Sequence, residues 1–164
     1  MTLFPDFTRV LVIGLGATAV LDIWLAFLGS VGVPTMNFAY LGRWLGHLFR
    51  GRFAHAAIAH AQPIRGELAW GWFLHYAIGV AFATLLVCWQ GEAWLQQPSL
   101  GPAVAVGIGT VLAPLLVLQP AMGAGFASSK TATPIKNSLR SVLNHAVFGL
   151  SLYGSSLLAA QFLR

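Results

Sequence analysis

The chain has 164 residues, of which 57% are hydrophobic and only 8% are charged, and its net charge is +5. Soluble domains carry about 25% charged residues, and a soluble chain of this length could not bury so much apolar surface. The composition therefore excludes an ordinary soluble domain and indicates one transmembrane domain over residues 1–164, with the lipid bilayer as its solvent.

Four apolar stretches are each close to the ~20 residues that a membrane-spanning helix needs. They cover residues 10–32, 68–90, 101–121 and 139–162. We therefore expect an all-α, integral membrane four-helix bundle. The first stretch is longer than the apolar region of a secretory signal, and Arg9 is the one basic residue before it. We therefore expect a span that is retained in the protein.

Two prolines are expected to interrupt the chain near its third and fourth spans. Pro114 can kink the third span and free a backbone carbonyl. Pro134 precedes the fourth span, and we expect Asn137 or Ser138 to cap that helix.

The loop at residues 33–67 mixes aromatic residues with arginines. Its apolar residues at helical spacing are Phe38, Leu41, Leu45 and Leu48. This spacing predicts a short amphipathic helix. Two interpretations stay open, a helix lying on an anionic inner leaflet or a helix packed beneath the bundle. The histidines of the loop, His47, His55 and His60, are not at a tight ligand spacing and do not predict a metal site.

Basic residues concentrate in two loops. The loop 33–67 has four arginines, the loop 122–140 has three basic residues, and the turn 91–100 has none, while Arg9 and Arg164 lie at the ends. Lys and Arg are retained on the cytoplasmic side, so we expect both long loops inside and both termini outside. This pattern indicates membrane topology rather than nucleic-acid binding. Trp89 and Trp94 are expected to anchor the outer interface.

The second and fourth spans share the pattern small-x3-His-x3-Gly, centred on His75 and His145. Residues four apart lie on one face of a helix. Small side chains let helices approach closely in lipid, so we expect helix-packing positions with a histidine between them. The expected packing positions are Gly71, Gly79, Ser141 and Gly149.

The first span has a stripe of small or polar residues that includes Asp22 at its centre. Gly107 and Gly109 in the third span echo Gly14 and Gly16 in the first. These similarities predict two parallel two-helix repeats, an arrangement known in transporters. The alternative is no repeat, because Asp22 has no acidic counterpart in the third span.

An ionised carboxylate in lipid costs several kcal/mol, and such residues usually face the bundle interior with a partner. We therefore expect a polar centre of Asp22, His75 and His145, with Gln119 and Asn144 as outer members. One interpretation is a titrating site that couples protons to a solute. The other is that Asp22 only hydrogen-bonds a histidine or the backbone and holds the helices together.

Two functional hypotheses follow from this centre. The leading hypothesis is a small-solute or proton-linked permease-like protein, and because four helices are few for a transport path, it predicts a homodimer. The rival is a non-catalytic structural, haem-binding or metal-binding subunit of a membrane assembly. Two histidines could ligate haem, or Asp22, His75 and His145 could hold a divalent metal, although the sequence requires no cofactor. We find no catalytic motif and expect no enzyme.

The stretch QPAMGAGFASSKTATPIKNSLRSVLNHAVFGLSLY, residues 119–153, resembles the C-terminal signature of a group of small bacterial membrane proteins known as a domain of unknown function. The early Asp in the first span, the basic first loop and the His-x-x-x-Gly of the second span extend the resemblance more weakly. The resemblance implies a four-span inner-membrane protein. It implies no activity, cofactor or catalytic residue.

Overall fold

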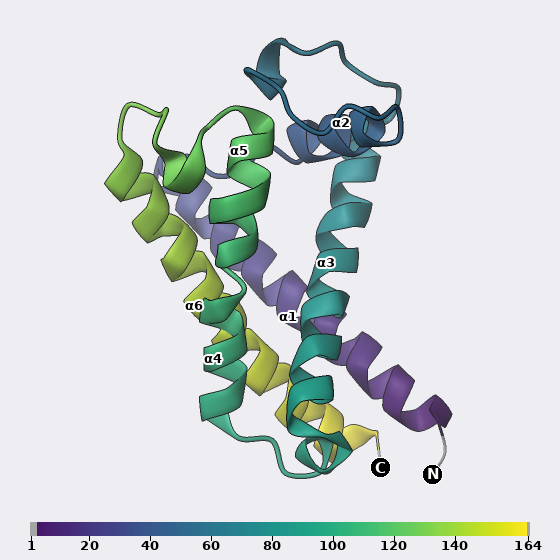
Figure 1. The fold of residues 1–164 in the computed structure, drawn as a ribbon. Coiled ribbons are helices and arrows are strands. Elements are labelled where there is room, and N and C mark those ends of the chain that lie inside the picture. Colours follow the sequence, from purple (N-terminus) through teal and green to yellow (C-terminus); the bar gives the residue numbers. More distant parts are fainter. Residues whose placement is uncertain (1–2, 164) are drawn as a thin grey trace. The chain divides into compact units, whose positions relative to one another are not determined.

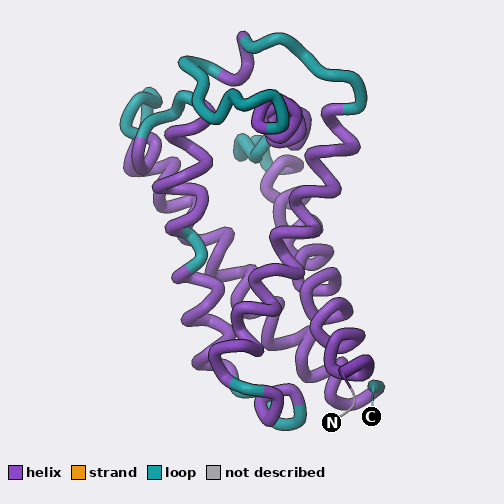
Figure 2. Tube along the Cα trace, turned by 45° about the vertical axis from the view of Figure 1, so that its right-hand side comes forward, coloured by secondary structure: helices purple, strands orange, loops and turns teal. Residues whose placement is uncertain are grey.

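The computed structural model describes residues 3–163, with side chains from residue 7 onward. Arg164, which the topology prediction counts, lies outside these residues. The regular structure of the described chain is helical, with no β-strand between residues 3 and 163 (Figures 1 and 2). The prediction of an all-α protein is confirmed.

Four stretches are long and apolar enough to cross a membrane, as predicted. Helix α1 is Leu3–Ser30, α3 is Glu67–Gln90 and α6 is Pro134–Phe162, and the third stretch is Leu100–Met122. Large apolar side chains on these helices are exposed, for example Ile23 at 71%. Water would disfavour such surfaces and lipid does not, so the structure fits an integral membrane protein with four spans.

The third stretch is a broken helix. Helix α4, Leu100–Gly109, ends in a turn, and a π-helical segment, Pro114–Leu118, leads into α5, Gln119–Met122. Pro114 has no backbone N–H, so it cannot donate to the carbonyl four residues earlier. Gly123 follows α5 with φ +97°, a left-handed conformation that favours glycine and ends the helix.

Helix α6 begins at Pro134 rather than near residue 139. Proline is favoured at the first helical position, where its missing N–H is not needed. The prediction that Asn137 or Ser138 caps this helix is therefore wrong. Instead Asn137 donates from Nδ2 to Thr131 Oγ1 at 2.9 Å, and Ser138 donates from Oγ to the Ala127 carbonyl at 2.8 Å.

The predicted amphipathic helix of the first long loop is α2, Phe38–Leu48. The Asn37 side chain caps it by accepting the Ala39 N–H at 2.9 Å. Its buried residues are Leu41, Gly42, Arg43, Leu45 and His47. Part of the helix surface, apolar residues included, is therefore covered by protein.

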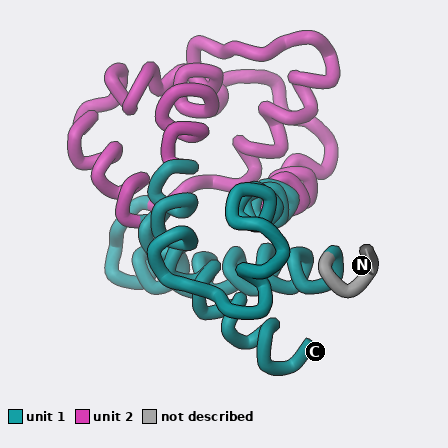
Figure 3. Tube along the Cα trace, turned by 60° about the horizontal axis from the view of Figure 1, so that its bottom comes forward, with its two compact units in different colours: residues 1–34, 76–110, 144–164 teal, residues 35–75, 111–143 magenta. Residues whose placement is uncertain are grey.

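The chain forms two compact units (Figure 3). Unit 1 contains the residues up to 34, residues 76–110 and the residues from 144 onward. Unit 2 contains residues 35–75 and 111–143, so it holds α2, the start of α3, the end of the third span and the start of α6.

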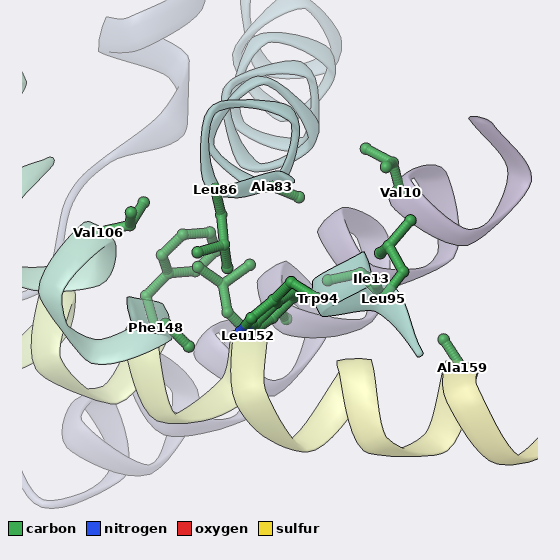
Figure 4. Close-up of a cluster of buried hydrophobic side chains, with 12 residues drawn as sticks. Val10, Ile13, Ala83, Leu86, Trp94, Leu95, Val106, Phe148, Leu152 and Ala159 are labelled. Atoms are coloured by element: carbon green, nitrogen blue, oxygen red, sulfur yellow. The ribbon is translucent and has the colours of Figure 1, made fainter. Parts of the chain in front are cut away.

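The core of unit 1 brings together side chains from α1, α3, α4 and α6 with the 3₁₀-helix Glu92–Leu95 (Figure 4). Leu86 and Leu152 are fully buried in this cluster. Trp94 is also part of it, at 6% exposure, and donates from Nε1 to Ser99 Oγ at 3.2 Å. The prediction that Trp94 is an interface anchor is wrong, because its ring packs in the core, whereas Trp89 is 60% exposed.

Candidate functional site

Asp22 in α1 is bonded to the neighbouring helix α3 in unit 1. The hydroxyl of Tyr76 donates to Asp22 Oδ2 at 2.8 Å, and both side chains are half-buried. A hydroxyl donor stabilises a carboxylate that water cannot reach freely. Tyr76 was not among the predicted site residues, although it directly follows His75.

Asn144 in α6 lies against α1. Trp24 donates from its indole nitrogen to Asn144 Oδ1 at 3.0 Å. Asn144, which was predicted as an outer member of the polar centre, is therefore hydrogen-bonded to Trp24, two residues after Asp22. This hydrogen bond links α1 to α6 in unit 1.

His145 lies beside the end of α4, next to the break in the third span. Its Nδ1 is 3.2 Å from the Gly107 carbonyl oxygen and 3.1 Å from Thr110 Oγ1. Thr110 Oγ1 in turn donates to the same Gly107 carbonyl at 2.8 Å. Because a carbonyl oxygen only accepts, Nδ1 carries the hydrogen in this geometry, and Nε2 is the basic nitrogen of the neutral ring.

His75, in unit 2, lies among aromatic rings. Its ring centroid is 4.6 Å from that of Phe38 in α2 and 5.9 Å from that of Trp72 one turn away in α3. The prediction that Asp22, His75 and His145 share one centre stays a prediction.

Gln119 joins two hydroxyls in unit 2. It accepts from Ser128 Oγ at 3.0 Å through Oε1, and it donates from Nε2 to Ser141 Oγ at 3.3 Å. Ser128 is buried and has φ +60°, and Ala127 before it has φ +46°. Gln119 therefore holds a strained turn against the start of α6.

The predicted packing glycines lie where helices approach closely. A Cβ on Gly79 would meet the Thr18 side chain of α1, and one on Gly149 would meet Gly107 of α4. In unit 2, a Cβ on Gly71 would meet the Phe38 carbonyl. At each of these positions a larger side chain would push the two helices apart.

An ion pair that the sequence analysis did not find joins α2 to the start of α3. Arg43 donates from Nε to Glu67 Oε2 at 2.9 Å and from Nη2 to Oε1 at 2.8 Å. Its Nη1 donates to the carbonyls of Ile58, Ala59 and Ala61 at 3.0–3.2 Å. The Glu67 carboxylate raises the pKa of Arg43, so the guanidinium, which is 7% exposed, stays charged. One arginine thus fixes the fold of residues 58–61.

A buried histidine pair lies in the same unit. His47 Nδ1 is 2.8 Å from His55 Nε2, and His47 Nε2 is 2.9 Å from the Gln62 carbonyl oxygen. The Gln62 carbonyl can only accept, so His47 Nε2 carries a hydrogen, and in the neutral pair His55 Nε2 donates to His47 Nδ1. The rings are 6% and 5% exposed.

The remaining nitrogen of the pair, His55 Nδ1, is buried and has no hydrogen-bond partner within the described chain. Burial lowers the pKa of His55 below its usual 6.5, and the charge of Arg52 and the His47 ring lower it further. The nearby Ala121 carbonyl offsets part of this effect, although it is not in hydrogen-bonding geometry with Nδ1. The His55 ring is therefore neutral at neutral pH.

Between residues 3 and 163, no group of three or more His, Cys, Asp or Glu side chains is arranged to hold a metal ion. The His47–His55 contact is a direct hydrogen bond, which leaves no room for an ion between the two nitrogens.

Comparison with known proteins places the chain in a family. No curated protein and no solved structure matches it significantly. A family model with the description "Protein of unknown function (DUF2938)" matches residues 11–159, which include most or all of every span. The resemblance stated from residues 119–153 is confirmed, and the chain belongs to this family of unknown function.

Proposed function

We propose that the chain is a small, non-enzymatic, permease-like membrane protein that links the movement of a small solute to that of protons. One observation carries the proposal: the third span is broken, and His145 contacts the backbone at the break. In transporters, broken helices with irregular backbone line the solute and ion sites. Unpaired backbone groups are tolerated at membrane depth only where protein or a water-filled cavity surrounds them.

His145 has the chemistry of a proton-exchanging group. With Nδ1–H directed at the Gly107 carbonyl, Nε2 offers its lone pair to a proton. Histidine is the side chain whose ordinary charge change lies closest to neutral pH. A proton on this half-buried ring would alter the contact between α4 and α6. Protonation of His145 could in this way change the access of solute to its binding site.

Asp22 with Tyr76 is the second group of the proposal. The Tyr76 hydroxyl donates a hydrogen bond to the Asp22 carboxylate. A proton, or a solute with its own hydroxyl or amine, could displace this bond, which connects α1 to α3. His75 belongs to the same proposal, with its ring beside the aromatic rings of Phe38 and Trp72.

The other predicted residues hold helices together in this proposal. Gln119 and Asn144 are occupied by the side chains of Ser128, Ser141 and Trp24. Four spans are few to enclose a path, so we expect a homodimer in a bacterial inner membrane, with both termini outside.

The test is proton movement in liposomes. The purified protein is reconstituted with a pH-sensitive dye inside, and the membrane potential is clamped with potassium and valinomycin. Sugars, amino acids, carboxylates and organic cations are added outside, one class at a time. We expect one class to change the internal pH beyond the change in protein-free liposomes, and we expect His145→Gln and Asp22→Asn each to abolish that change.

The matched control is Thr84→Ala in α3. Thr84 is exposed and bonds only within its own helix, to the Val80 carbonyl at 2.9 Å. This variant should keep the full pH change. If no class of solute changes the internal pH, or if His145→Gln retains the response, the proposal is wrong.

A further inference from the structure

An open groove of about 610 Å³ runs along the first turns of α6 in unit 2. Its apolar lining comes from Ile135, Leu139 and Leu143, and its basic lining from Lys136 and Arg140. The three apolar side chains are 77%, 63% and 50% exposed. Nothing in the described chain covers this face.

Helical geometry places the apolar and basic residues of the groove in two adjoining stripes. Ile135, Leu139 and Leu143 are four residues apart and form one line about 12 Å long at 1.5 Å rise per residue. Lys136 and Arg140 are also four apart, and each is three residues before a leucine of the line. The groove therefore has an apolar surface with two basic side chains along one edge.

The position of the groove matches the boundary between lipid headgroups and acyl chains. Helix α6 has 29 residues, or about 43 Å, against about 30 Å for the hydrocarbon core of a bilayer. The charged residues of α6 lie in its first seven positions, and the rest of the described helix has none. The part of α6 that exceeds the hydrocarbon core is therefore its N-terminal end, which lies at the level of the lipid phosphates.

Within the part of the chain that the structure describes, Lys136 and Arg140 have no acidic partner. The ion pair Arg43–Glu67 involves neither of them. Residues 93–164 contain no Asp or Glu at all. An anion from outside the chain is therefore the natural partner of Lys136 and Arg140.

We propose that this groove binds one anionic phospholipid. An acyl chain lies along Ile135, Leu139 and Leu143, and the phosphate lies between the Lys136 ammonium and the Arg140 guanidinium. This inference does not depend on the proposed transport function, because it uses none of the same residues.

The test is native mass spectrometry of the detergent-purified chain with equal amounts of phosphatidylglycerol and phosphatidylcholine. We expect one retained phosphatidylglycerol per chain. Lys136→Gln with Arg140→Gln should weaken its binding roughly 30-fold, the effect of two basic contacts to anionic lipid. Leu139→Trp fills the apolar part of the groove and keeps both charges, and it should also weaken phosphatidylglycerol binding.

Two further variants separate the site from general charge and from misfolding. Lys130→Gln with Arg65→Gln removes the same net charge at exposed positions outside the groove and should bind like the unaltered chain. Lys136→Arg with Arg140→Lys keeps both charges and should also retain the lipid. Equal retention of the two lipids by the unaltered chain, or an equal loss in the Lys130/Arg65 control, would overturn the proposal.

Discussion

His47 and His55 form a direct hydrogen bond of 2.8 Å between buried rings, and the Gln62 carbonyl determines which nitrogen donates. The bond joins α2 to the loop that follows it. A proton added to His55 would go to Nδ1, which is buried and has no partner within the described chain, so it would place a positive charge where water cannot solvate it.

The first prediction is that acid weakens this loop. His55 has a lowered pKa in the folded state, so the unfolded chain binds a proton first. Stability is therefore fully present above about pH 6.5 and falls as the pH drops from there towards the folded pKa, by at most about 1.4 kcal/mol per pH unit. Hydrogen exchange of residues 47–62 as a function of pH measures it.

The charged groups around the pair set the control for this prediction. Arg52 disfavours a proton on His55, and the nearby Glu67 carboxylate is held by Arg43. His55→Gln should remove the acid-dependent loss of protection, and the exposed His60→Gln should not. Identical pH profiles for His55→Gln and the unaltered chain would contradict the account.

The second prediction concerns the Arg43–Glu67 pair. Glu67→Gln leaves a buried guanidinium without its carboxylate, and we expect a loss of about 3 kcal/mol in the free energy of unfolding. Unfolding by SDS in mixed micelles measures it. The exposed Arg65→Gln serves as control and should stay within about 0.5 kcal/mol. Equal effects of the two substitutions would refute the role given to this pair.

The third prediction concerns the crossing of α2 and α3. A Cβ on Gly42 would collide with the Glu67 carbonyl, and one on Gly71 with the Phe38 carbonyl. Backbone atoms cannot swing aside, so Gly42→Ala and Gly71→Ala should each destabilise the protein by about 1–3 kcal/mol. Gly154→Ala meets nothing within 4 Å in α6 and should be neutral or stabilising. Thermal unfolding in detergent distinguishes these opposite signs.

The fourth prediction concerns the bond between Tyr76 and Asp22. Tyr76→Phe removes the donor and should destabilise the protein by about 1 kcal/mol, the usual range for a hydrogen bond between membrane helices. Asp22→Ala in the Tyr76→Phe background should then cost less than in the unaltered chain, as a double-mutant cycle in SDS unfolding would show. Additive effects would mean that the two side chains are not coupled.

Much of the fold could be predicted from the sequence because its signals are local. Apolar length predicts the four spans, and spacing from Phe38 to Leu48 predicts α2. The predicted start of α6 is too late because Pro134 acts as the first helical residue and not as a breaker. The prediction for Trp94 is wrong because composition alone does not distinguish a tryptophan at the membrane interface from one in the core.

The polar contacts could be predicted less well because they join distant residues. Arg43 and Glu67 are 24 residues apart, and His47 meets a histidine in a loop without regular spacing. One feature of the sequence does point to Tyr76. It carries a hydroxyl group in an otherwise apolar span, and Asp22 needs a hydrogen-bond donor. The shared centre of Asp22, His75 and His145 stays a prediction.

The central claim is that His145 exchanges a proton beside the broken third span. The most direct measurement is ¹⁵N NMR of histidine-labelled protein in lipid bilayers, with the His145→Gln variant assigning the signal. We predict a neutral ring with hydrogen on Nδ1 and the lone pair on Nε2, whose signal moves to the protonated position on acidification while the protein stays folded. A ring with hydrogen on Nε2 alone, or one that never changes its protonation, would contradict the account.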